Sequence, residues 1–492
     1  MALTTMTIAE LLPLADLRPE QANIDVTGLA LDSRQISSGD VFIALAGHSV
    51  DGRQYLVQAQ NSGAVAALVS ADDFDFPVEL TLPIIVVEDL AETLDDIACR
   101  FYRQPFSHLD VIGVTGTNGK TSCSQLIAQL LTNNGYCTGV LGTAGWGLGE
   151  AQHESTHTTP DAVGLQAIAA QLVDQGATSL AMEVSSHALD QNRVSAVQFN
   201  TAVFTNLSRD HLDYHGTMQA YAEAKRKLFQ MPSLQHAVVN IDDEQGRQLL
   251  AFIAGDVDVI RYSILDEAAD LFVSDLSYCL SGVSGVIHYR GQQAPFRSPL
   301  LGEFNVANVL ATVAVLLLKG VSLSRATNSL HDVKPARGRL QLVPTEHNLS
   351  VLVDYAHTPD ALEKVLLSLR KHTERRLWVV FGCGGDRDNG KRPLMAEAAC
   401  LADCVVVTSD NPRTEDPQQI IAQILPGLCD GTERHIIADR EQAIAFAVNH
   451  AEPGDCIVVA GKGHETYQDI KGVKYPFDDF DKINNALLHR VK

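Results

Sequence analysis

The stretch VIGVTGTNGKTS, residues 111–122, joins an apolar run to a glycine-rich turn and then to the helix-like SCSQLIAQLL. Such a turn points backbone N–H groups at phosphate, and the helix that follows adds its positive end. Lys120 would reach the β- and γ-phosphates, and the Thr121 hydroxyl could ligate Mg²⁺. The pattern departs from the general P-loop, because Val114 stands where the first glycine belongs. We expect a nucleotide site here; the alternative is a tight strand–helix turn with an incidental lysine.

Apolar runs separated by helix-like stretches occur on both sides of this motif, which is typical of parallel sheets with crossover helices. The runs predicted as strands are 40–45, 65–70, 83–88, 111–116, 179–186, 201–208, 236–242, 351–356, 377–382, 404–409 and 456–461. The last four are almost continuously apolar, as expected of strands buried on both faces. The stretch VKPARGR, at 333–339, contains a proline and a glycine and is a plausible hinge.

The fold class predicted from this pattern is α/β with three domains, in agreement with a chain of 492 residues at ~150 residues per domain. We expect a smaller N-terminal α/β domain at 1–90 and a central P-loop-type ATPase domain with a parallel sheet at 91–335. A Rossmann-like C-terminal α/β domain would occupy 336–492.

Composition excludes several classes of partner. A formal net charge of −23 argues against a duplex nucleic-acid partner, although a small anion can still bind to local cations and helix N-termini. The nine cysteines contain no C-x-x-C pair, which favours reduced thiols in a cytoplasmic protein. The N-terminus lacks a basic segment, and the most apolar segment, 306–318, is too short to cross a bilayer. We therefore expect a cytoplasmic monomer with no membrane partner.

Further motifs extend along the whole chain. They are LDSR (31–34), GHSVDGR (47–53), TTPD (158–161), MEVSSHALDQNRV (182–194), TNLSRDHLDYHG (205–216), EAKRKLF (223–229), GEFNVANVLA (302–311), ARGRLQ (336–341), VDYAHTPDAL (353–362), FGCGGDRDNGKRPLM (381–395), SDNPRTEDP (409–417) and AGKGHETYQ (460–468). With GTNGKTS, this ordered set resembles the Mur ligase family. That family consists of ATP-dependent enzymes that add amino acids to the peptidoglycan precursor, in cell-wall biogenesis, cell shape and cell division.

The resemblance implies a ligase that adds meso-diaminopimelate to UDP-N-acetylmuramoyl-L-alanyl-D-glutamate, with ATP as co-substrate and Mg²⁺ as cofactor. ATP would phosphorylate the carboxylate, and the acyl phosphate would then accept the amine. The transition states carry much negative charge, so the protein must supply cations and alignment. The implied catalytic residues are Lys120, Glu183, His211 and Lys225.

The resemblance implies metal ligands at Thr121, Glu183, His211 and Lys225, the lysine as its carbamate (N6-carboxylysine). Glu183 follows the apolar run SLAM, at the end of a predicted strand where α/β sites lie. Taken alone, Glu183 would be a capping or salt-bridged glutamate and Lys225 a solvated helix lysine. Taken alone, His211 would be a surface ion-pair partner rather than a ligand for a second metal ion.

The resemblance assigns binding residues to ATP and to the UDP-substrate. ATP would contact Gly116, Thr117, Asn118, Gly119, Lys120, Thr121, Ser122, Asn305, Asn308, Arg339, Asp354 and His357. The UDP-substrate would contact Leu31, Ser33, His48, Ser49, Val50, Thr158, Thr159, Ser185, Gln191 and Arg193. Asp354 could instead cap the helix that begins near TPDALEKVL, and the role of His157 stays open.

The loop SDNPRTEDP, at 409–417, places a single arginine among acidic residues. The family uses DNPR at this place with meso-diaminopimelate rather than lysine. The implied contacts are Arg392, Asp410, Asn411, Pro412, Arg413, Gly461 and Glu465. A planar guanidinium can bind the distal carboxylate that only diaminopimelate carries. The alternative is that Arg413 merely neutralises Glu415 and Asp416.

Two other functions remain possible from the sequence. One is an enzyme similar to folylpolyglutamate synthase, against which the N-terminal motifs argue. The other is an ATP-gated binding or regulatory protein without ligase activity, against which the intact set of catalytic candidates argues.

Overall fold

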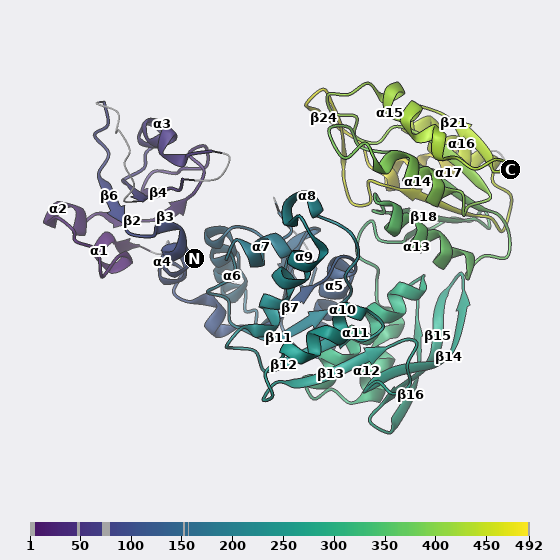
Figure 1. The fold of residues 1–492 in the computed structure, drawn as a ribbon, viewed down its shortest axis with the longest axis horizontal. Helices are drawn as coiled ribbons and strands as arrows, with labels where there is room; N and C mark the ends of the chain where they lie inside the picture. The colour runs from purple at the N-terminus through teal and green to yellow at the C-terminus, as the bar shows by residue number, and fades with distance from the viewer. Residues whose placement is uncertain (1–4, 47–49, 71–78, 151–152, 156, 491–492) are drawn as a thin grey trace. The chain divides into compact units, whose positions relative to one another are not determined.

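The computed structural model describes residues 5–46, 50–70, 79–150, 153–155 and 157–490 (Figure 1). The chain forms two compact units and passes between them several times. The first consists of Met1–Gly113, Tyr136–Ala202 and Gln219–Gln235. The second consists of Val114–Gly135, Val203–Met218 and His236–Lys492. Strands β7 (Asp110–Thr115) and β11 (Phe199–Phe204) each run from the first unit into the second.

The N-terminal part of the first unit is a four-stranded parallel sheet. Its order is β3 (Gly28–Ala30), β4 (Asp40–Ala44), β5 (Ala66–Ser70) and β6 (Ile84–Val87). Alternate residues of β4 enter different cores, because Val41 and Ile43 belong to one apolar cluster and Phe42 and Ala44 to another. Helices α4 (Leu90–Phe101) and α3 (Leu56–Asn61) contribute to these two clusters respectively. The three strands expected before residue 90 are confirmed.

The rest of the first unit positions part of the site. Strand β10 (Ser179–Glu183) pairs in parallel with β8 (Thr138–Gly142), and β9 (Gly145–Leu148) returns antiparallel to β8. The expected strand at 179–186 ends at Glu183, because the Ser185 side chain accepts a hydrogen bond from Ala188 N and caps a short helix. The helices of this region are α6 (Ala162–Asp174), α7 (Ser186–Asp190) and α9 (Met218–Arg226).

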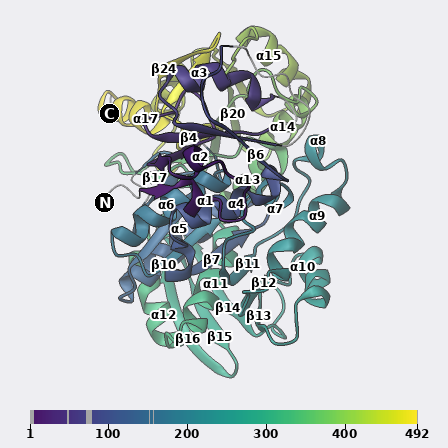
Figure 2. The ribbon, with the colours of Figure 1, turned by 90° about the vertical axis from the view of Figure 1, so that its left-hand side faces the viewer.

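In the second unit, β12 (His236–Asn240) pairs in parallel with β13 (Asp258–Ser263), and β13 pairs in parallel with β14 (Leu271–Cys279). An antiparallel ribbon follows, in which β15 (Gly282–Tyr289) pairs with both β14 and β16 (Gln292–Ser298). Figures 1 and 2 both show this ribbon beside β13. The alternation expected from the sequence included β12 but not the ribbon. The helices of this region are α5 (Lys120–Asn133), α8 (Leu212–His215), α10 (Glu244–Leu249), α11 (Glu303–Leu318) and α12 (Leu323–Ser329).

A six-stranded sheet forms the C-terminal part of the second unit, parallel except for its antiparallel edge strand β17. Its order is β17 (Gln341–Val343), β18 (Ser350–Asp354), β22 (Cys456–Ala460), β19 (Leu377–Phe381), β20 (Cys404–Val407) and β21 (Glu433–Ile436). One face packs on α13 (Pro359–Arg370), α14 (Lys391–Ala399) and α15 (Pro417–Ile424), and the other on α16 (Arg440–His450) and α17 (Asp479–Leu488).

The near-continuous apolar character of these strands has the expected cause. Along β19, Leu377, Val379 and Phe381 enter one apolar cluster, whereas Trp378 and Val380 enter the other. Both faces are thus covered, and the prediction of an α/β chain built on parallel sheets is confirmed. A hairpin of β23 (Tyr467–Ile470) and β24 (Val473–Pro476) follows the last sheet strand.

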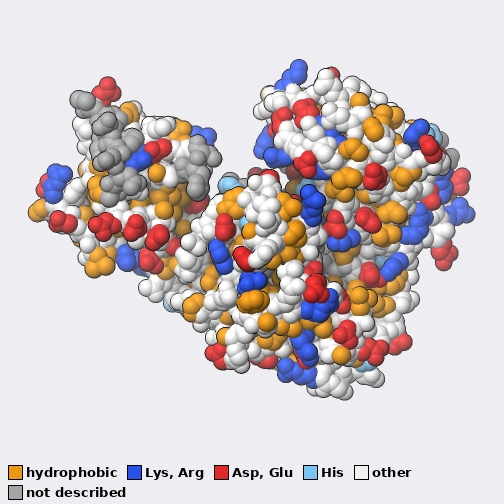
Figure 3. All heavy atoms as spheres, in the orientation of Figure 1, with side chains coloured by type: hydrophobic (Ala, Val, Ile, Leu, Met, Phe, Trp, Pro, Cys, Tyr) orange, Lys and Arg blue, Asp and Glu red, His pale blue; other side chains and the backbone are white. Residues whose placement is uncertain are grey.

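Within the described ranges, the chain has no helix whose length and apolar character would let it span a bilayer. On the face drawn in Figure 3, acidic and basic side chains are interspersed.

Candidate active site

The phosphate turn lies between β7 and α5. Helix α5 begins at Lys120, two residues before the helix-like stretch that starts at Ser122, with Gly119 as its N-cap at φ +88°. A side chain at Gly119 would meet Asn308 Oδ1 at 2.7 Å, so the turn needs glycine there. The Lys120 ammonium donates to the carbonyls of Gly116 (3.0 Å) and Thr117 (2.9 Å). The lysine therefore lies over its own loop.

The residues after β11 brace this turn, which the sequence did not predict. Thr205 Oγ1 donates to Asn118 O (2.6 Å), and the Asn206 side chain both accepts from Asn118 N and donates to Asn118 O, at 3.0 Å each. Ser208 N donates to Thr117 Oγ1 (3.0 Å). The sequence signal that could have predicted these contacts is the run of polar residues directly after an apolar strand. They hold the phosphate turn in a fixed shape.

Glu183 ends β10 as expected, and only 1% of it is exposed. Its carboxylate accepts from Thr143 N (2.7 Å) and Thr143 Oγ1 (3.2 Å), and Thr143 in turn donates to the Thr158 hydroxyl (3.0 Å). A Cβ at Gly142 would meet Glu183 Oε1 at 2.1 Å. The carboxylate is thus oriented by a glycine–threonine turn and is neither a helix cap nor half of a salt bridge among the described residues.

Lys225 is not the solvated lysine of the alternative interpretation. It is 2% exposed, and its ammonium lies 4.6 Å from the centre of the Tyr221 ring on the same helix, α9. His211, in the second unit, precedes α8 with φ +52°, and its Nε2 lies 3.5 Å from Asp210 Oδ2. When its imidazole is protonated, His211 forms with Asp210 the surface ion pair expected as the alternative.

Thr159 is connected by hydrogen bonds to the UDP-substrate candidates that follow β10. Its hydroxyl donates to Glu183 O (2.9 Å) and accepts from Ser185 N (3.1 Å), and its carbonyl accepts from Arg193 Nη1 (3.3 Å). Arg193 also donates to the Gln191 side chain. These candidates and Thr158 therefore form one connected group with Glu183.

The N-terminal candidates lie elsewhere in the first unit. Ser33 is buried and donates to Gln58 Oε1 (3.1 Å), whereas Val50 is exposed and Leu31 half-buried. His48 and Ser49 lie outside the described residues. His157, whose role the sequence left open, is exposed, and its carbonyl accepts a hydrogen bond from Ser155 Oγ (2.6 Å).

Asn305 lies in the first turn of α11 as expected, and Asn308 follows one turn later. Both are buried, and Asn308 Nδ2 donates to Asn305 Oδ1 (2.9 Å). Asn308 Oδ1 accepts from the Cys123 thiol of α5 (3.3 Å). Together with its approach to Gly119, this places Asn308 against the phosphate turn.

Asp354 does not cap a helix, because Thr358 caps α13. The Asp354 carboxylate accepts from Leu340 N and Ala356 N, at 2.8 Å each. Burial raises the pKa of this carboxyl, and the neighbouring Arg339 opposes that rise. Arg339 in turn lies 4.6 Å from the centre of the Tyr355 ring.

His357 lies in the turn that leads to α13. Its exposed ring has Nδ1 2.9 Å from Tyr355 O and packs edge-on against the Tyr355 ring. Arg339 Nε is buried and has no hydrogen-bond partner among the described residues. A donor of that kind is suited to an anionic ligand.

Arg413 does not neutralise its acidic neighbours, so the alternative interpretation is wrong. Glu415 accepts from Arg392 Nη1 (2.9 Å) and Nη2 (2.8 Å), and Asp416 caps α15. Arg413 has φ +51°, and its Nη1 donates to Gly385 O (2.7 Å). No carboxylate of the described residues forms an ion pair with Arg413, which leaves much of its guanidinium for a ligand.

Residues from the turn after β22 and from the start of α16 contact this loop. The Asn411 side chain donates to Glu465 Oε2 (2.7 Å). Buried Lys462, which was not among the residues predicted from the sequence, donates to Asn411 Oδ1 (3.0 Å). Asp410 Oδ2 is buried without a hydrogen-bond partner among the described residues, although Arg440 Nη1 lies 3.8 Å away. Gly461, at φ +117°, leaves room for that oxygen, since a Cβ would meet it at 2.6 Å.

Two further candidates lie around the same loop. Arg392 is fully buried and donates to Glu415, Gln423 and Gly384 O, so it supports the loop from behind. Pro412 is also buried.

Comparison with known proteins gives a consistent family. Residues 25–102 match the Mur ligase family, catalytic domain; residues 114–316 match the Mur ligase middle domain; and residues 338–463 match the Mur ligase, glutamate ligase domain. A UDP-N-acetylmuramoyl-L-alanyl-D-glutamate--2,6-diaminopimelate ligase from Ectopseudomonas mendocina is 48% identical over 97% of this chain and 98% of its own length. The ligase of the same name from Pseudomonas aeruginosa is 46% identical over 98% of each chain.

Solved structures agree. A structure of a ligase with this name superposes with a TM-score of 0.70 at 39% identity, covering 98% of this chain and 99% of the other. A folylpolyglutamate synthase from Mycobacterium tuberculosis, at 20% identity, covers 76% of this chain and 92% of its own with a TM-score of 0.63, and shares the fold alone. With a buried carboxylate beside a threonine turn, a braced phosphate loop and these matches along its length, the chain belongs to the Mur ligase family.

Proposed function

We propose that this chain is an ATP-dependent ligase that joins meso-diaminopimelate to UDP-N-acetylmuramoyl-L-alanyl-D-glutamate in the synthesis of the peptidoglycan precursor. The observation that carries the proposal is the agreement over almost the whole chain, at 46–48% identity, with relatives whose names state this reaction. The guanidinium of Arg413, which forms no ion pair with the described residues, supports the choice of amino acid.

The reaction requires activation of the glutamate carboxylate. Transfer of the γ-phosphoryl group to that carboxylate gives an acyl phosphate and ADP. Attack by the amine of diaminopimelate then forms the amide, releases phosphate and frees a proton. Lys120 and the backbone N–H groups of the phosphate turn supply positive charge where the transferred group becomes more anionic.

Mg²⁺ fits the residues proposed to hold it. The Glu183 carboxylate is buried and held in one orientation by Thr143, and a hard cation prefers such oxygen ligands. Thr121 and His211 are the further candidates. Bound Mg²⁺ would neutralise charge on the phosphates.

Lys225 is proposed to act as its carbamate. Its burial supports this, because a buried ammonium is costly and desolvation favours the neutral amine that reacts with CO₂. The carbamate replaces a cation by a group with one negative charge, whose two oxygens can ligate Mg²⁺.

The two organic substrates are proposed to bind to different groups of residues. The connected group of Thr158, Thr159, Ser185, Gln191 and Arg193 would hold the sugar-peptide near Glu183. Ser33 and the other N-terminal candidates would hold the uridine diphosphate.

For the amino acid, Arg413 would bind the distal carboxylate in a bidentate manner. Asp410 Oδ2, which accepts no hydrogen bond from the described residues, would accept from the distal ammonium. Lysine has the distal ammonium but no distal carboxylate, so it cannot make both interactions.

We also propose domain boundaries near residues 90 and 335, a monomer, a cytoplasmic location and no nucleic-acid partner. The net charge of −23 and the free state of all nine cysteines support the last two. Limited proteolysis would test the boundaries and light scattering the monomer.

Phosphate release from ATP tests the proposed function. It should require both the UDP-sugar-dipeptide and meso-diaminopimelate, and lysine should be a poor replacement. Release with a folate and glutamate would instead identify a folylpolyglutamate synthase activity. Nucleotide binding without turnover under all these conditions would identify a regulatory protein.

A further inference from the structure

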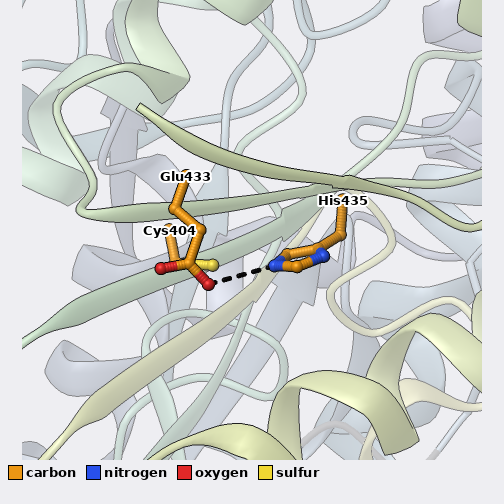
Figure 4. A group of neighbouring side chains, drawn as sticks. All are labelled: Cys404, Glu433 and His435. Atoms are coloured by element: carbon orange, nitrogen blue, oxygen red, sulfur yellow. Dashed lines mark hydrogen bonds and ion pairs between the residues drawn. The ribbon is translucent and has the colours of Figure 1, made fainter. Parts of the chain in front are cut away.

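Three metal-ligating side chains meet at the edge of the C-terminal sheet, away from the site described above. Cys404 begins β20, and Glu433 begins the edge strand β21. The parallel register places Cys404 beside Glu433, and His435 follows on the same face of β21 because side chains alternate along a strand. Their ligand atoms lie within 4.8 Å of one another. Figure 4 shows the sulfur, the carboxylate and the imidazole turned toward a common point.

Neighbouring residues orient two of these side chains. The two carboxylate oxygens of Glu433 have different partners. Oε2 forms an ion pair with Arg376, and Oε1 lies 3.1 Å from His435 Nε2. The His435 ring packs against Phe446 of α16, with the ring centres 4.4 Å apart. Such supporting contacts fix the direction of a ligand and are a common part of metal sites.

We propose that Cys404, Glu433 and His435 form a site for a divalent transition metal of the zinc type. One thiolate, one imidazole and one carboxylate are ligands that Zn²⁺ accepts, and three protein ligands leave a fourth position for water. Glu433 and His435 are partly exposed, so an ion can reach the site from solvent. Because Oε1 faces the other two ligands, Glu433 can bind a metal and keep its pair with Arg376.

Binding requires the loss of one proton. Burial raises the pKa of the Cys404 thiol to about 12, so the thiol is protonated without metal. The metal would replace that proton: the S–H bond breaks, an S–metal bond forms, and H⁺ passes to water. Affinity should therefore increase with pH.

The site is distinct from the proposed active site. Cys404 lies at the N-terminal end of β20, whereas Asp410, Asn411 and Arg413 follow its C-terminal end. In parallel sheets, catalytic residues gather at the C-terminal ends of strands. The metal would instead tie the edge strand β21 to β20, and we expect it to affect stability rather than turnover.

The alternative is that these residues form only an ion-pair cluster around Glu433, with Arg376 as its cation. Titration of chelator-treated full-length protein with Co²⁺, without nucleotide, separates the two. A metal site predicts one Co²⁺ per chain with a thiolate-to-metal charge-transfer band, and its displacement by Zn²⁺. Saturating Zn²⁺ should also raise the apparent Tm.

Variants locate the site. Cys404→Ser should abolish the charge-transfer band, and His435→Gln should weaken Co²⁺ binding by about tenfold or more, a range typical of perturbed metal sites. His435→Gln also serves if the core substitution prevents folding. Cys429→Ser, which removes an exposed thiol elsewhere in the same unit, is the control and should change nothing. Absence of the band in the unmodified protein, or its persistence in Cys404→Ser, would overturn the proposal.

Discussion

Replacement of Arg413 by alanine tests the basis of amino-acid selection. The guanidinium donates to Gly385 O and makes no ion pair with the described residues, so the substitution leaves no buried carboxylate without its partner. Both residues have a Cβ, so the cost of the left-handed backbone at φ +51° cancels in the comparison. The loss should therefore fall mainly on the ligand.

The expected size follows from the bonds removed. A bidentate pair to the distal carboxylate consists of two charge-assisted hydrogen bonds, each contributing about 1.5–3 kcal/mol. Their loss amounts to about 3–6 kcal/mol, and every 1.36 kcal/mol is a factor of ten in rate. The kcat/KM for meso-diaminopimelate should therefore fall by about 10²- to 10⁴-fold. Lysine has no second carboxylate, so its kcat/KM should change little.

The assay is phosphate release in competition between diaminopimelate and lysine, with KM for ATP and for the UDP-sugar-dipeptide measured in parallel. Arg413→Lys keeps the charge but not the planar pair, and should recover only part of the activity. Arg434→Ala, which removes an exposed arginine from β21, is the control. If the preference for diaminopimelate survives in Arg413→Ala, the proposed role of this loop is wrong.

Three further perturbations concern other parts of the molecule. Gly142→Ala should displace the Glu183 carboxylate and lower kcat about tenfold or more, with the affinity for ATP unchanged. Gly164→Ala, where a Cβ fits, is the control and should leave kcat unchanged. Equal kcat values for the two variants would refute the assignment of Glu183. Lys225→Ala should lose most activity and regain part of it with short-chain carboxylic acids, and an unmodified amine in fully active enzyme, detected by intact mass, would contradict the carbamate. Burial lowers the pKa of His464 to about 4, below its ordinary 6.5. The neutral His464 side chain thus contributes at most about 3 kcal/mol to the free energy of unfolding above pH 6.5, and this contribution is lost as pH falls toward 4. The apparent Tm of the unmodified protein should therefore fall more steeply over this range than that of His464→Gln. Parallel profiles of Tm against pH would refute this.

Much of the fold could be predicted because its strands are short apolar runs buried on both sides. The antiparallel ribbon was not predicted because no continuous apolar run marks it. In the second half of β14, for example, partly buried and exposed residues alternate. The expected strand at 179–186 was too long because its last residues cap and begin a helix.

Site residues fixed by local motifs were easier to find than their partners. The phosphate turn is contiguous in the sequence, whereas Thr205 meets Asn118 across 87 residues. The adjacency of Arg413 and Glu415 suggested a pair, yet Glu415 binds Arg392, 23 residues away. The partner of the Glu415 carboxylate is set by the packing of α14 against the loop and not by proximity in the sequence.

The position of Lys120 affects how nucleotide affinity should depend on the medium. Its ammonium already donates to two carbonyls of its own loop, so phosphate binding exchanges hydrogen bonds rather than adding them. The net attraction then comes mainly from charge, in a protein whose overall charge repels a polyanion. Added salt screens such an attraction. Affinity for ATP should consequently weaken as ionic strength rises, and more steeply than affinity for AMP, which carries fewer charges to that loop.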